Sequence, residues 1–427
     1  MSTQGGRVGK VARAAGSGGS VAIESCQVCG HAPLKAVLSL GYMPPVNQMV
    51  PLSQPERQQP WFPTTLLHCG KCELVQLGLA VDPAIIFPRE YPYTSGTTRL
   101  LRDNFADLQR ESAAIFNLNG SDLVVDIGSN DGTLLANFKN AGQRVLGIEP
   151  TDVGDLANQR GIPTLKRYFG PQVAREVLRE HGLASVVTAA NCFAHIEDVH
   201  SVVDGIFAML RPDGVFISES HYLLPLLDGL QYDTIYHEHL RYYSLASLKY
   251  LFEMHDLEVF HARPIPSHGG SIRVYCARRK VHPVEASVRQ MLAAEPRGEA
   301  MVKRLDAFRR DVILSKLRLV SMLSELKETG ARIAGISAPS RASTLVNYVG
   351  LDEGLIEYVC EIAGSLKIGK YMPGTRIPVV DEERLFSDQP DCALIFSWHI
   401  ADELAPKLRA NGFRGRLIAP LPTPRFV

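Results

Sequence analysis

Proton-handling side chains are concentrated in one short stretch of this 427-residue chain. The segment DTIYHEHLRYYS, residues 233–244, contains two histidines, a glutamate and three tyrosines. A histidine can accept a proton at neutral pH, and a tyrosine hydroxyl can hydrogen-bond a developing oxyanion. The composition of this segment therefore suits acid–base catalysis.

The spacing of the two histidines narrows what they can do. In an extended segment, His237 and His239 share one face. Tyr236 and Glu238 share the other. A catalytic metal is disfavoured, because paired zinc-binding histidines on a helix are spaced i,i+4 and no third ligand is evident. The histidines then either act on a ligand or only satisfy buried backbone groups.

The position of the segment favours a ligand. It follows the apolar run GVFISES, residues 214–220, and His195 follows the preceding apolar run in the same way. In open α/β sheets, ligands bind beyond the carboxyl ends of the strands. His195 and the histidines of the segment are therefore expected at the same edge of a sheet.

Four of the eight cysteines form two CxxC pairs, Cys26 with Cys29 and Cys69 with Cys72. Two such turns can complete a closed, tetrahedral, structural zinc site. The alternatives are unrelated thiols or a redox pair, but neither pair begins a helix in a βαβ pattern. We predict structural zinc, because a small N-terminal unit lacks an adequate core without metal.

A glycine-containing turn follows the first strand of the central region, in DLVVDIGSNDGTLLANF, residues 122–138. Glycine lets the backbone approach a ligand closely, and Glu149 ends the next strand, where a carboxylate can accept hydrogen bonds from both ribose hydroxyls. The spacing is not GxGxxG, and Asn130 and Asp131 make the turn unsuited to a pyrophosphate. It suits S-adenosylmethionine, whose charged groups include a cationic sulfonium and ammonium. A purely structural glycine turn is the alternative.

Strands and helices alternate around these residues. Apolar runs at residues 144–150, 184–196 and 214–220 have helical spacing between them, which is typical of a doubly wound parallel sheet. A polar helical stretch at about 284–329 precedes a second set of apolar runs at α/β spacing. We expect an α/β protein with these segments: a disordered tail 1–21, a zinc-binding domain 22–80, an α/β domain 81–283 and a second α/β domain 284–427.

Charge and composition exclude several partners. Lys plus Arg and Asp plus Glu both number 45, so no net field attracts nucleic acid or an anionic membrane. No apolar run approaches the roughly 20 residues that span a bilayer, and the N-terminus lacks the apolar core of a signal peptide. We expect a cytoplasmic protein without nucleic-acid or membrane partners, as a monomer or small homo-oligomer.

Taken together, these features resemble the sugar C-methyltransferases of deoxysugar biosynthesis, which act on dTDP-linked 4-keto-deoxysugars. Besides the CxxC pairs, the motifs that carry the resemblance occur in the family's order: YPYTSG (91–96), DIGSNDGTLL (126–135), GIEP (147–150), FAHI (193–196), YHEHLRYYS (236–244), GGSIRV (269–274), KYMPGTRIPV (370–379) and FSWHIADEL (396–404). The resemblance implies an N-terminal zinc domain, a central class I methyltransferase domain of Rossmann-like fold and a C-terminal Rossmann-like domain. The sugar nucleotide would lie in the cleft.

The resemblance also implies roles. His239 would be the base that generates an enolate for methylation at C-3, with Tyr236, Glu238 and His195 as nearby proton-handling or orienting groups. Tyr91, or Tyr93, would face the sugar. The candidate cofactor-binding residues are Asp126, Gly128, Asn130, Gly132, Glu149 and Asn191. At Ser337 and Arg341 the family usually has Gly and Lys, which leaves the exact sugar open.

Two other functions fit parts of the sequence. A zinc-ribbon RNA methyltransferase would combine CxxC pairs with a methyltransferase fold, but the neutral charge and the lack of a basic, aromatic face argue against it. A non-catalytic sugar-nucleotide binder is the other.

Two short stretches leave alternatives open. Gly269 and Gly270 could approach a diphosphate or form a β-bulge. Lys367, Lys370 and Arg376 could contact phosphate, although a solvated loop is expected.

Overall fold

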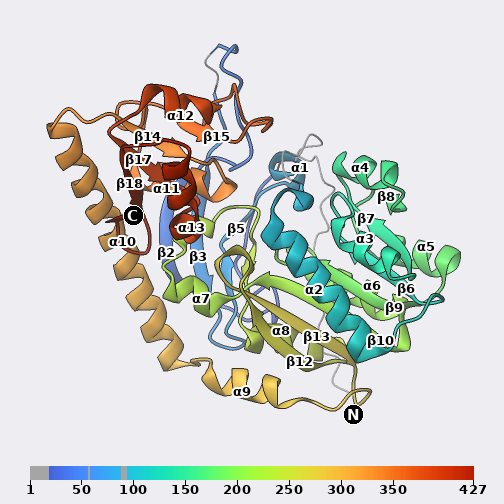
Figure 1. The fold of residues 1–427 in the computed structure, drawn as a ribbon. Coiled ribbons are helices and arrows are strands. Elements are labelled where there is room, and N and C mark those ends of the chain that lie inside the picture. Colours follow the sequence, from blue (N-terminus) through green and yellow to red (C-terminus); the bar gives the residue numbers. More distant parts are fainter. Residues whose placement is uncertain (1–18, 56–57, 88–93) are drawn as a thin grey trace.

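The computed structural model describes residues 19–55, 58–87 and 94–427. Most of the predicted tail, residues 1–21, lies outside them. Figure 1 shows the central and C-terminal α/β domains on either side of a small sheet, with helix α10 (Glu299–Glu328) along the outer edge. The predicted α/β fold class is confirmed.

The small sheet is antiparallel and is built mainly from N-terminal residues. Its strand order is β11-β4-β3-β2. The strands are β2 (Lys35–Met43), β3 (Phe62–His68), β4 (Val75–Leu77) and β11 (Arg241–Tyr242). A separate pair joins β1 (Val21–Ala22) to β5 (Leu79–Ala80), followed by helix α1 (Pro83–Ile86). Because β11 belongs to the segment 233–244, that segment is anchored in the N-terminal sheet.

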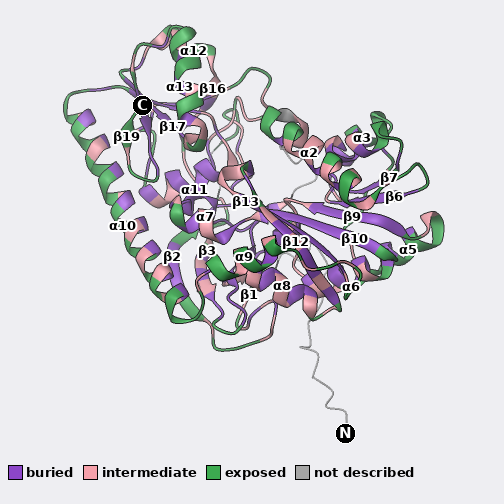
Figure 2. Ribbon diagram, turned by 60° about the horizontal axis from the view of Figure 1, so that its bottom comes forward, coloured by how far each residue is buried: buried purple, intermediate pink, exposed green. Residues whose placement is uncertain are grey.

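The central sheet has seven strands in the order β12-β13-β10-β9-β6-β7-β8. Five strands are parallel: β6 (Leu123–Ile127), β7 (Arg144–Ile148), β8 (Thr164–Leu165), β9 (Ala184–Ala190) and β10 (Leu210–His221). β13 (Ser271–Arg278) runs antiparallel between β10 and β12 (Leu257–Ile265). The inner strands are apolar and buried on both faces, as Figure 2 shows for β9 and β10, because helices cover the sheet.

The helices of this domain follow the predicted alternation. They are α2 (Arg99–Phe116), α3 (Thr133–Asn140), α4 (Val153–Gln159), α5 (Pro171–His181), α6 (Val199–Met209), α7 (Leu223–Asp228) and α8 (Leu245–Glu253). Short 3₁₀ turns lie at Ser95–Thr97, Phe193–His195 (η2), Tyr232–Thr234 and Ser267–Gly269 (η4). The η2 and η4 turns carry histidines of the candidate site.

The predicted helical stretch after this domain is two helices, α9 (Ala286–Ala294) and α10. The break falls at Pro296, which lacks a backbone donor, and at Gly298, which has φ 55°. As the helical spacing predicted, α10 buries Val312, Leu319 and Leu323. The other face of this helix is exposed (Figure 2).

The C-terminal domain is the second α/β unit that the sequence predicted. Its strand order is β16-β15-β14-β17-β18-β19. The elements are β14 (Ile333–Ile336), α11 (Ser340–Val349), β15 (Val359–Glu361), β16 (Val379–Asp381), α12 (Glu383–Asp388), β17 (Cys392–Ile395), a 3₁₀ turn at Trp398–Ile400, α13 (Ala401–Ala410), β18 (Arg416–Ala419) and β19 (Arg425–Phe426). In the described parts of the chain, no helix has the length and apolar character needed to cross a membrane.

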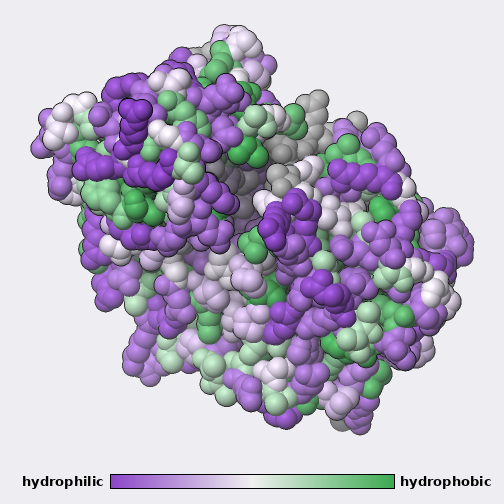
Figure 3. Space-filling view, viewed as in Figure 1, coloured by the Kyte–Doolittle hydropathy of each residue, from purple (hydrophilic) through white to green (hydrophobic). Residues whose placement is uncertain are grey.

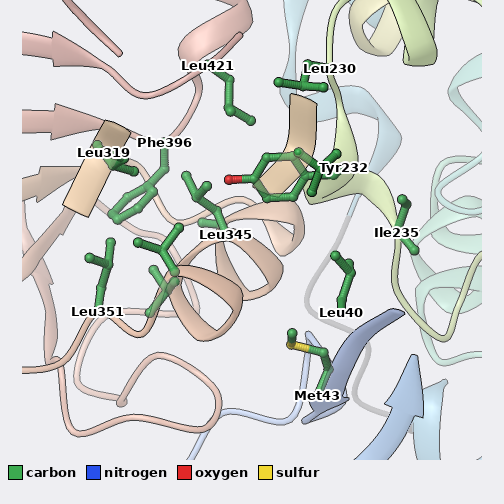
Figure 4. Close-up of a cluster of buried hydrophobic side chains, with 14 of the residues drawn as sticks. Leu40, Met43, Leu230, Tyr232, Ile235, Leu319, Leu345, Leu351, Phe396 and Leu421 are labelled. Carbon is green, nitrogen blue, oxygen red and sulfur yellow. The ribbon is translucent and has the colours of Figure 1, made fainter. Parts of the chain in front are cut away.

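One hydrophobic core joins the N-terminal sheet to the C-terminal domain. Figure 4 shows Leu40 of β2, Ile235 of the segment 233–244 (hereafter the acid–base segment) and Leu345 of α11 in the same buried cluster. Leu319 of α10 and Phe396, which follows β17, belong to it as well. The position of the C-terminal domain is therefore held by packed side chains and not only by its linker.

Candidate active site and zinc site

A cleft opens between the central and C-terminal domains and continues along residues 21–30 of the N-terminal domain, with a total volume of about 3040 Å³. Figure 3 shows the surface hollowed between the C-terminal domain and helix α2. Pockets for single small molecules usually measure about 300–1,000 Å³, so this cleft has room for two ligands. Its walls include the glycine-containing turn of the central domain, the histidines of the acid–base segment and several basic residues of the C-terminal domain.

The acid–base segment makes a tight turn where an extended chain was expected. The His239 backbone N–H donates to the Tyr236 carbonyl at 2.9 Å, and the two rings lie 4.1 Å apart between centroids. The His237 ring points elsewhere: its Nε2 lies 3.0 Å from the Thr64 hydroxyl, and it packs edge-on against Phe62. The expectation that His237 and His239 share a face is therefore wrong, because the turn reverses the chain between them.

The hydrogen bonding of His239 defines which of its nitrogens is basic. Nδ1 lies 2.7 Å from the Thr234 carbonyl, which can only accept, so Nδ1 carries the proton. In the neutral ring, Nε2 then has a free lone pair. Burial lowers the pKa of His239 to about 4, so the ring is neutral at pH 7. His239 lines the cleft and can accept a proton there.

Three further histidines surround His239. His195 of η2 stacks on it at 5.0 Å between centroids with an interplanar angle of 23°. His221, at the end of β10, lies edge-on at 5.0 Å, and His268 of η4 lies 5.6 Å from His221. Burial lowers the pKa of each of these three histidines. The cleft thus holds a group of neutral imidazoles, of which the sequence predicted two.

His221 and His268 had weak signals in the sequence. His221 ends the strand GVFISESH, and His268 directly precedes the GGSIRV motif. Either position could have been linked to a ligand site by the rule that applied to His195.

Glu238 connects the three domains at the cleft. Its Oε1 accepts a hydrogen bond from Asn47 Nδ2 at 2.7 Å, and Asn47 Oδ1 accepts one from the Ser340 hydroxyl at 2.9 Å. Glu238 lines the cleft with Tyr236. Tyr91 and Tyr93, the candidates for contact with the sugar, lie outside the described residues.

A buried ion pair fixes the start of the acid–base segment to the C-terminal domain. The Arg341 guanidinium donates through Nε and Nη2 to the two carboxylate oxygens of Asp233, each at 2.7 Å. Trp398 Nε1 donates to the same carboxylate at 2.7 Å. A bidentate pair of this kind sets orientation as well as distance. Arg341, at the position where the resembled family usually has Lys, thus bridges two domains.

The glycine-containing turn has the conformation that its sequence predicted. Gly128 and Gly132 have φ angles of 71° and 77°. A Cβ at Gly128 would lie 2.7 Å from the Cys192 Cβ, and one at Gly132 would be tight against Ala157 and Ile162. The two glycines are therefore needed for backbone conformation and packing, and Gly128 also lines the cleft.

Glu149 is held rigidly at the edge of the cleft. Its Oε2 accepts the Asn130 backbone N–H at 3.1 Å. Its Oε1 accepts the backbone N–H and the hydroxyl of Thr151 at 2.9 and 2.6 Å. These bonds orient the carboxylate beside the turn before any ligand is bound.

Asp126 and Asn191 differ in their relation to the cleft. Asp126 is buried behind the turn and accepts from the Thr188 hydroxyl at 2.6 Å. Burial raises the pKa of Asp126 to about 8. Asn191 lines the cleft with φ 60°, and both polar atoms of its amide are buried without a hydrogen-bond partner in the described part of the chain. An unpartnered buried amide is unfavourable, so a ligand that bonds it would gain affinity.

The four cysteines of the CxxC pairs meet at one point. Their Sγ atoms all lie within 4.8 Å of one another, with Cys26 to Cys72 at 3.4 Å and Cys29 to Cys69 at 3.5 Å. Tetrahedral zinc with bonds of about 2.3 Å places its sulfurs about 3.8 Å apart, so the set fits the ion.

The two cysteine turns share one backbone pattern. Gly30 N–H donates to the Cys26 carbonyl, and Glu73 N–H donates to the Cys69 carbonyl, both at 2.9 Å. Gly30 and Glu73 also share a positive φ, 69° and 61°. Such equivalent turns present both thiols of each pair to one ion. The predicted closed site, without an open position for chemistry, is structural.

One expectation about the loops needs correction, and the glycines of the other stretch have a packing role. Lys367 is not on a solvated loop: it lines the cleft, and its Nζ donates to the Ala338 carbonyl at 2.6 Å. Gly269 and Gly270 are explained by packing, since a Cβ on either would come within 2.5 Å of Gln231 or Pro225. Gly269 also accepts a hydrogen bond from Gln231, so the glycines serve the loop itself.

Comparison with known families divides the chain into three matching regions. Residues 26–87 match a zinc binding domain, residues 96–262 a methyltransferase domain and residues 266–422 the C-methyltransferase C-terminal domain. The C-methyltransferase NovU of Streptomyces niveus is 35% identical over 411 residues, which cover 95% of this chain and 97% of NovU.

Solved structures match parts of the chain. The PH0226 protein of Pyrococcus horikoshii OT3 is 15% identical with a TM-score of 0.37 and covers 45% of this chain and 97% of its own. The magnesium protoporphyrin IX methyltransferase of Synechocystis PCC 6803 is 13% identical with a TM-score of 0.32. The match covers 42% of this chain and 79% of that protein.

Proposed function

This chain belongs to the C-methyltransferase family and uses S-adenosylmethionine, and we propose that its acceptor is a dTDP-linked 4-keto-deoxysugar methylated at C-3. The observation that carries the proposal is the state of His239, which is neutral, has an unprotonated Nε2 and lines a cleft large enough for two ligands. A C-methyltransferase acting beside a ketone needs such a base. Zinc has a structural role in the N-terminal domain.

The proposed reaction begins with proton removal. The C-3 hydrogen of the sugar is acidic because it lies next to the C-4 ketone. His239 Nε2 takes that proton, and the electron pair of the C–H bond moves to give an enolate. Tyr236, which packs on His239, donates a hydrogen bond to the enolate oxygen. Glu238 and His195 orient the sugar and the imidazole.

Methyl transfer then completes the reaction. The enolate carbon attacks the sulfonium methyl group, the C–S bond breaks, and S-adenosylhomocysteine leaves with the electron pair of that bond. The ketone re-forms at C-4. The proton taken by His239 passes to solvent, so each turnover releases one proton. Tyr91, or Tyr93, completes the sugar site in this proposal.

We assign the two ligands to opposite walls of the cleft. S-adenosylmethionine lies on the turn that contains Gly128 and Asn130, with its ribose on Glu149 and a polar group on the Asn191 amide. Asp126 and Gly132 support this turn from behind. The sugar nucleotide lies against the C-terminal domain, where Lys367 and Lys370 provide positive charge for the diphosphate. We further propose that residues 22–80, 81–283 and 284–427 are the functional domains.

A substrate panel tests the acceptor. The purified protein would be given S-adenosylmethionine with dTDP-linked 4-keto-deoxysugars, and products would be analysed by mass spectrometry and NMR. We expect one methyl group on carbon 3 of at least one sugar and an equal amount of S-adenosylhomocysteine. Methylation of oxygen, or of RNA with strong salt dependence, would contradict the proposal.

The isosteric change Glu149→Gln is expected to weaken S-adenosylmethionine binding. Loss of one charge-assisted ribose hydrogen bond costs about 1.5–3 kcal/mol, which corresponds to roughly ten- to a hundredfold in Kd. Calorimetry would measure this, with dTDP binding unchanged. Asp155→Asn is the matched control, because Asp155 lies on α4 nearby and pairs with Lys166 outside the cleft. Equal cofactor affinity in folded Glu149→Gln would contradict the ribose assignment.

On the acid side of the pH profile, kcat/KM is expected to fall with a midpoint near pH 4. Only neutral His239 accepts the proton, and burial lowers its pKa to about 4, so kcat/KM should stay high from pH 7 down to about 5 and fall below that. A histidine with an unshifted pKa would give a fall in kcat/KM with a midpoint near pH 6.5. Zinc content must be followed at each pH, because protonation of thiolates releases the metal. A midpoint near 6.5 in zinc-loaded protein would contradict the assignment.

A further inference from the structure

Arg241 is a buried arginine with no carboxylate partner among the described residues. It lies two positions after His239, on β11. All of its hydrogen-bond acceptors are neutral. Nε donates to the Tyr243 hydroxyl at 2.9 Å, and Nη1 donates to Gln27 Oε1 at 3.1 Å.

The remaining donors of Arg241 bind the loop that follows His195. Nη2 donates to the Ile196 carbonyl, and Nη1 also reaches the Glu197 carbonyl at 3.5 Å. A charge is unfavourable in a buried site unless hydrogen bonds satisfy it. These acceptors are backbone and side-chain oxygens of three separate segments, so the guanidinium requires all three to be in place at once.

Gln27 is part of the first cysteine turn, between Cys26 and Cys29, and is itself fixed. Its backbone N–H donates to Gln76 Oε1 at 2.9 Å, and its carbonyl accepts from His200 Nε2 at 3.2 Å. Its side chain then has a defined direction toward Arg241. The zinc-bound turn is in this way connected through two hydrogen bonds to the loop of His195.

The catalytic histidines depend on the same two segments. His195 precedes Ile196, and His239 precedes β11, so Arg241 ties together the chain on both sides of the stacked rings. The Leu240 backbone N–H also donates to the Ala194 carbonyl at 3.1 Å. Backbone bonds set the spacing of the two segments, and Arg241 adds the connection to the cysteine turn.

We infer that Arg241 is a positioning residue that transmits the geometry of the zinc-bound turn, through Gln27, to the His195–His239 stack. The inference rests on the proposed function in so far as these two histidines act in the reaction. It gives the zinc site a role in catalysis beyond folding.

Electrostatics supports the arrangement. His195 faces His239, His268, Arg241 and the ring of Phe87. Burial is the main cause of its lowered pKa, and the permanent positive charge of Arg241 lowers it further. Removing the Arg241 charge should therefore raise the pKa of His195 toward that of a free imidazole.

The test compares Gln27→Met with Gln27→Glu in zinc-loaded, full-length protein. Gln27→Met removes the acceptor at similar volume, whereas Gln27→Glu keeps an oxygen for Arg241. Both should hold one zinc per chain and bind S-adenosylhomocysteine like the wild type. Gln27→Met should lose about tenfold or more in kcat with little change in KM, because a small displacement of catalytic groups suffices. Gln27→Glu should retain kcat.

A second readout does not depend on the substrate. Histidine NMR of the ligand-free protein should show shifted His195 and His239 ring signals in Gln27→Met and Arg241→Met, and wild-type signals in Gln27→Glu. Arg241→Met should also raise the pKa of His195. The inference is overturned if zinc-loaded Gln27→Met keeps the wild-type ring signals. If no sugar is methylated, the proposed function fails while this readout still decides the positioning role.

Discussion

His239→Ala should lose turnover and substrate hydrogen exchange together, by roughly 10²- to 10⁴-fold. Removal of the C-3 proton is reversible when no methyl donor is present. With S-adenosylhomocysteine bound, the wild-type enzyme should therefore exchange that hydrogen with D₂O. The variant has no nitrogen at the position of Nε2, so exchange and methylation should both fall by this factor. NMR of the sugar measures exchange, and mass spectrometry measures methylation.

Two variants in the same turn make the test specific. His237→Gln is the matched control, because His237 bonds Thr64 in the N-terminal sheet and should leave exchange intact. Tyr236→Phe should slow both steps less steeply, because an oxyanion donor is lost while the base remains. If His239→Ala folds, binds both ligands and exchanges at the wild-type rate, another group is the base. His195 would be examined next.

Loss of zinc should unfold the N-terminal domain. Metal analysis of protein purified without chelator should find one zinc per chain. Cys72→Ser, or treatment with a strong chelator, should release it and lower the unfolding temperature sharply, because the binding energy of a closed cysteine site is largely folding energy. Three of the four cysteines pack in the same buried cluster as the central domain, so methyl transfer should be lost as well.

A buried cysteine outside the site provides the control. Cys276→Ala alters β13 and should reduce stability modestly while one zinc is retained. Thermal unfolding with and without chelator compares the two variants. Absence of zinc in wild-type protein, or an unchanged unfolding temperature in Cys72→Ser, would contradict a structural metal site.

The features that could be predicted from the sequence are those set by nearby residues. Each cysteine turn is closed by hydrogen bonds within a few residues, as between Gly30 and Cys26. The turn from Gly128 to Gly132 likewise needs its glycines for local conformation. Apolar runs at α/β spacing predicted both doubly wound units, because strands buried on two faces have a continuous apolar pattern.

The features that could not be predicted depend on distant parts of the chain. His221 and His268 come together only because β13 pairs antiparallel with β10, placing His221 opposite Ser271. Arg341 reaches Asp233 across 108 residues of sequence. The turn before His239 was missed because no glycine, proline or asparagine marks it within the motif.

The core shared by β2 and the C-terminal domain has a consequence for how the chain is made. β2 contacts α10 and α11, whose residues lie more than 250 positions later in the sequence. During synthesis, N-terminal segments emerge first and fold with what is available. The cysteine turns can form then, but the apolar residues of β2, such as Leu40, are not fully covered until α10 and α11, in the last third of the chain, leave the ribosome. The cleft is therefore completed only at the end of translation, and until then the nascent chain exposes the part of β2 that α10 and α11 cover.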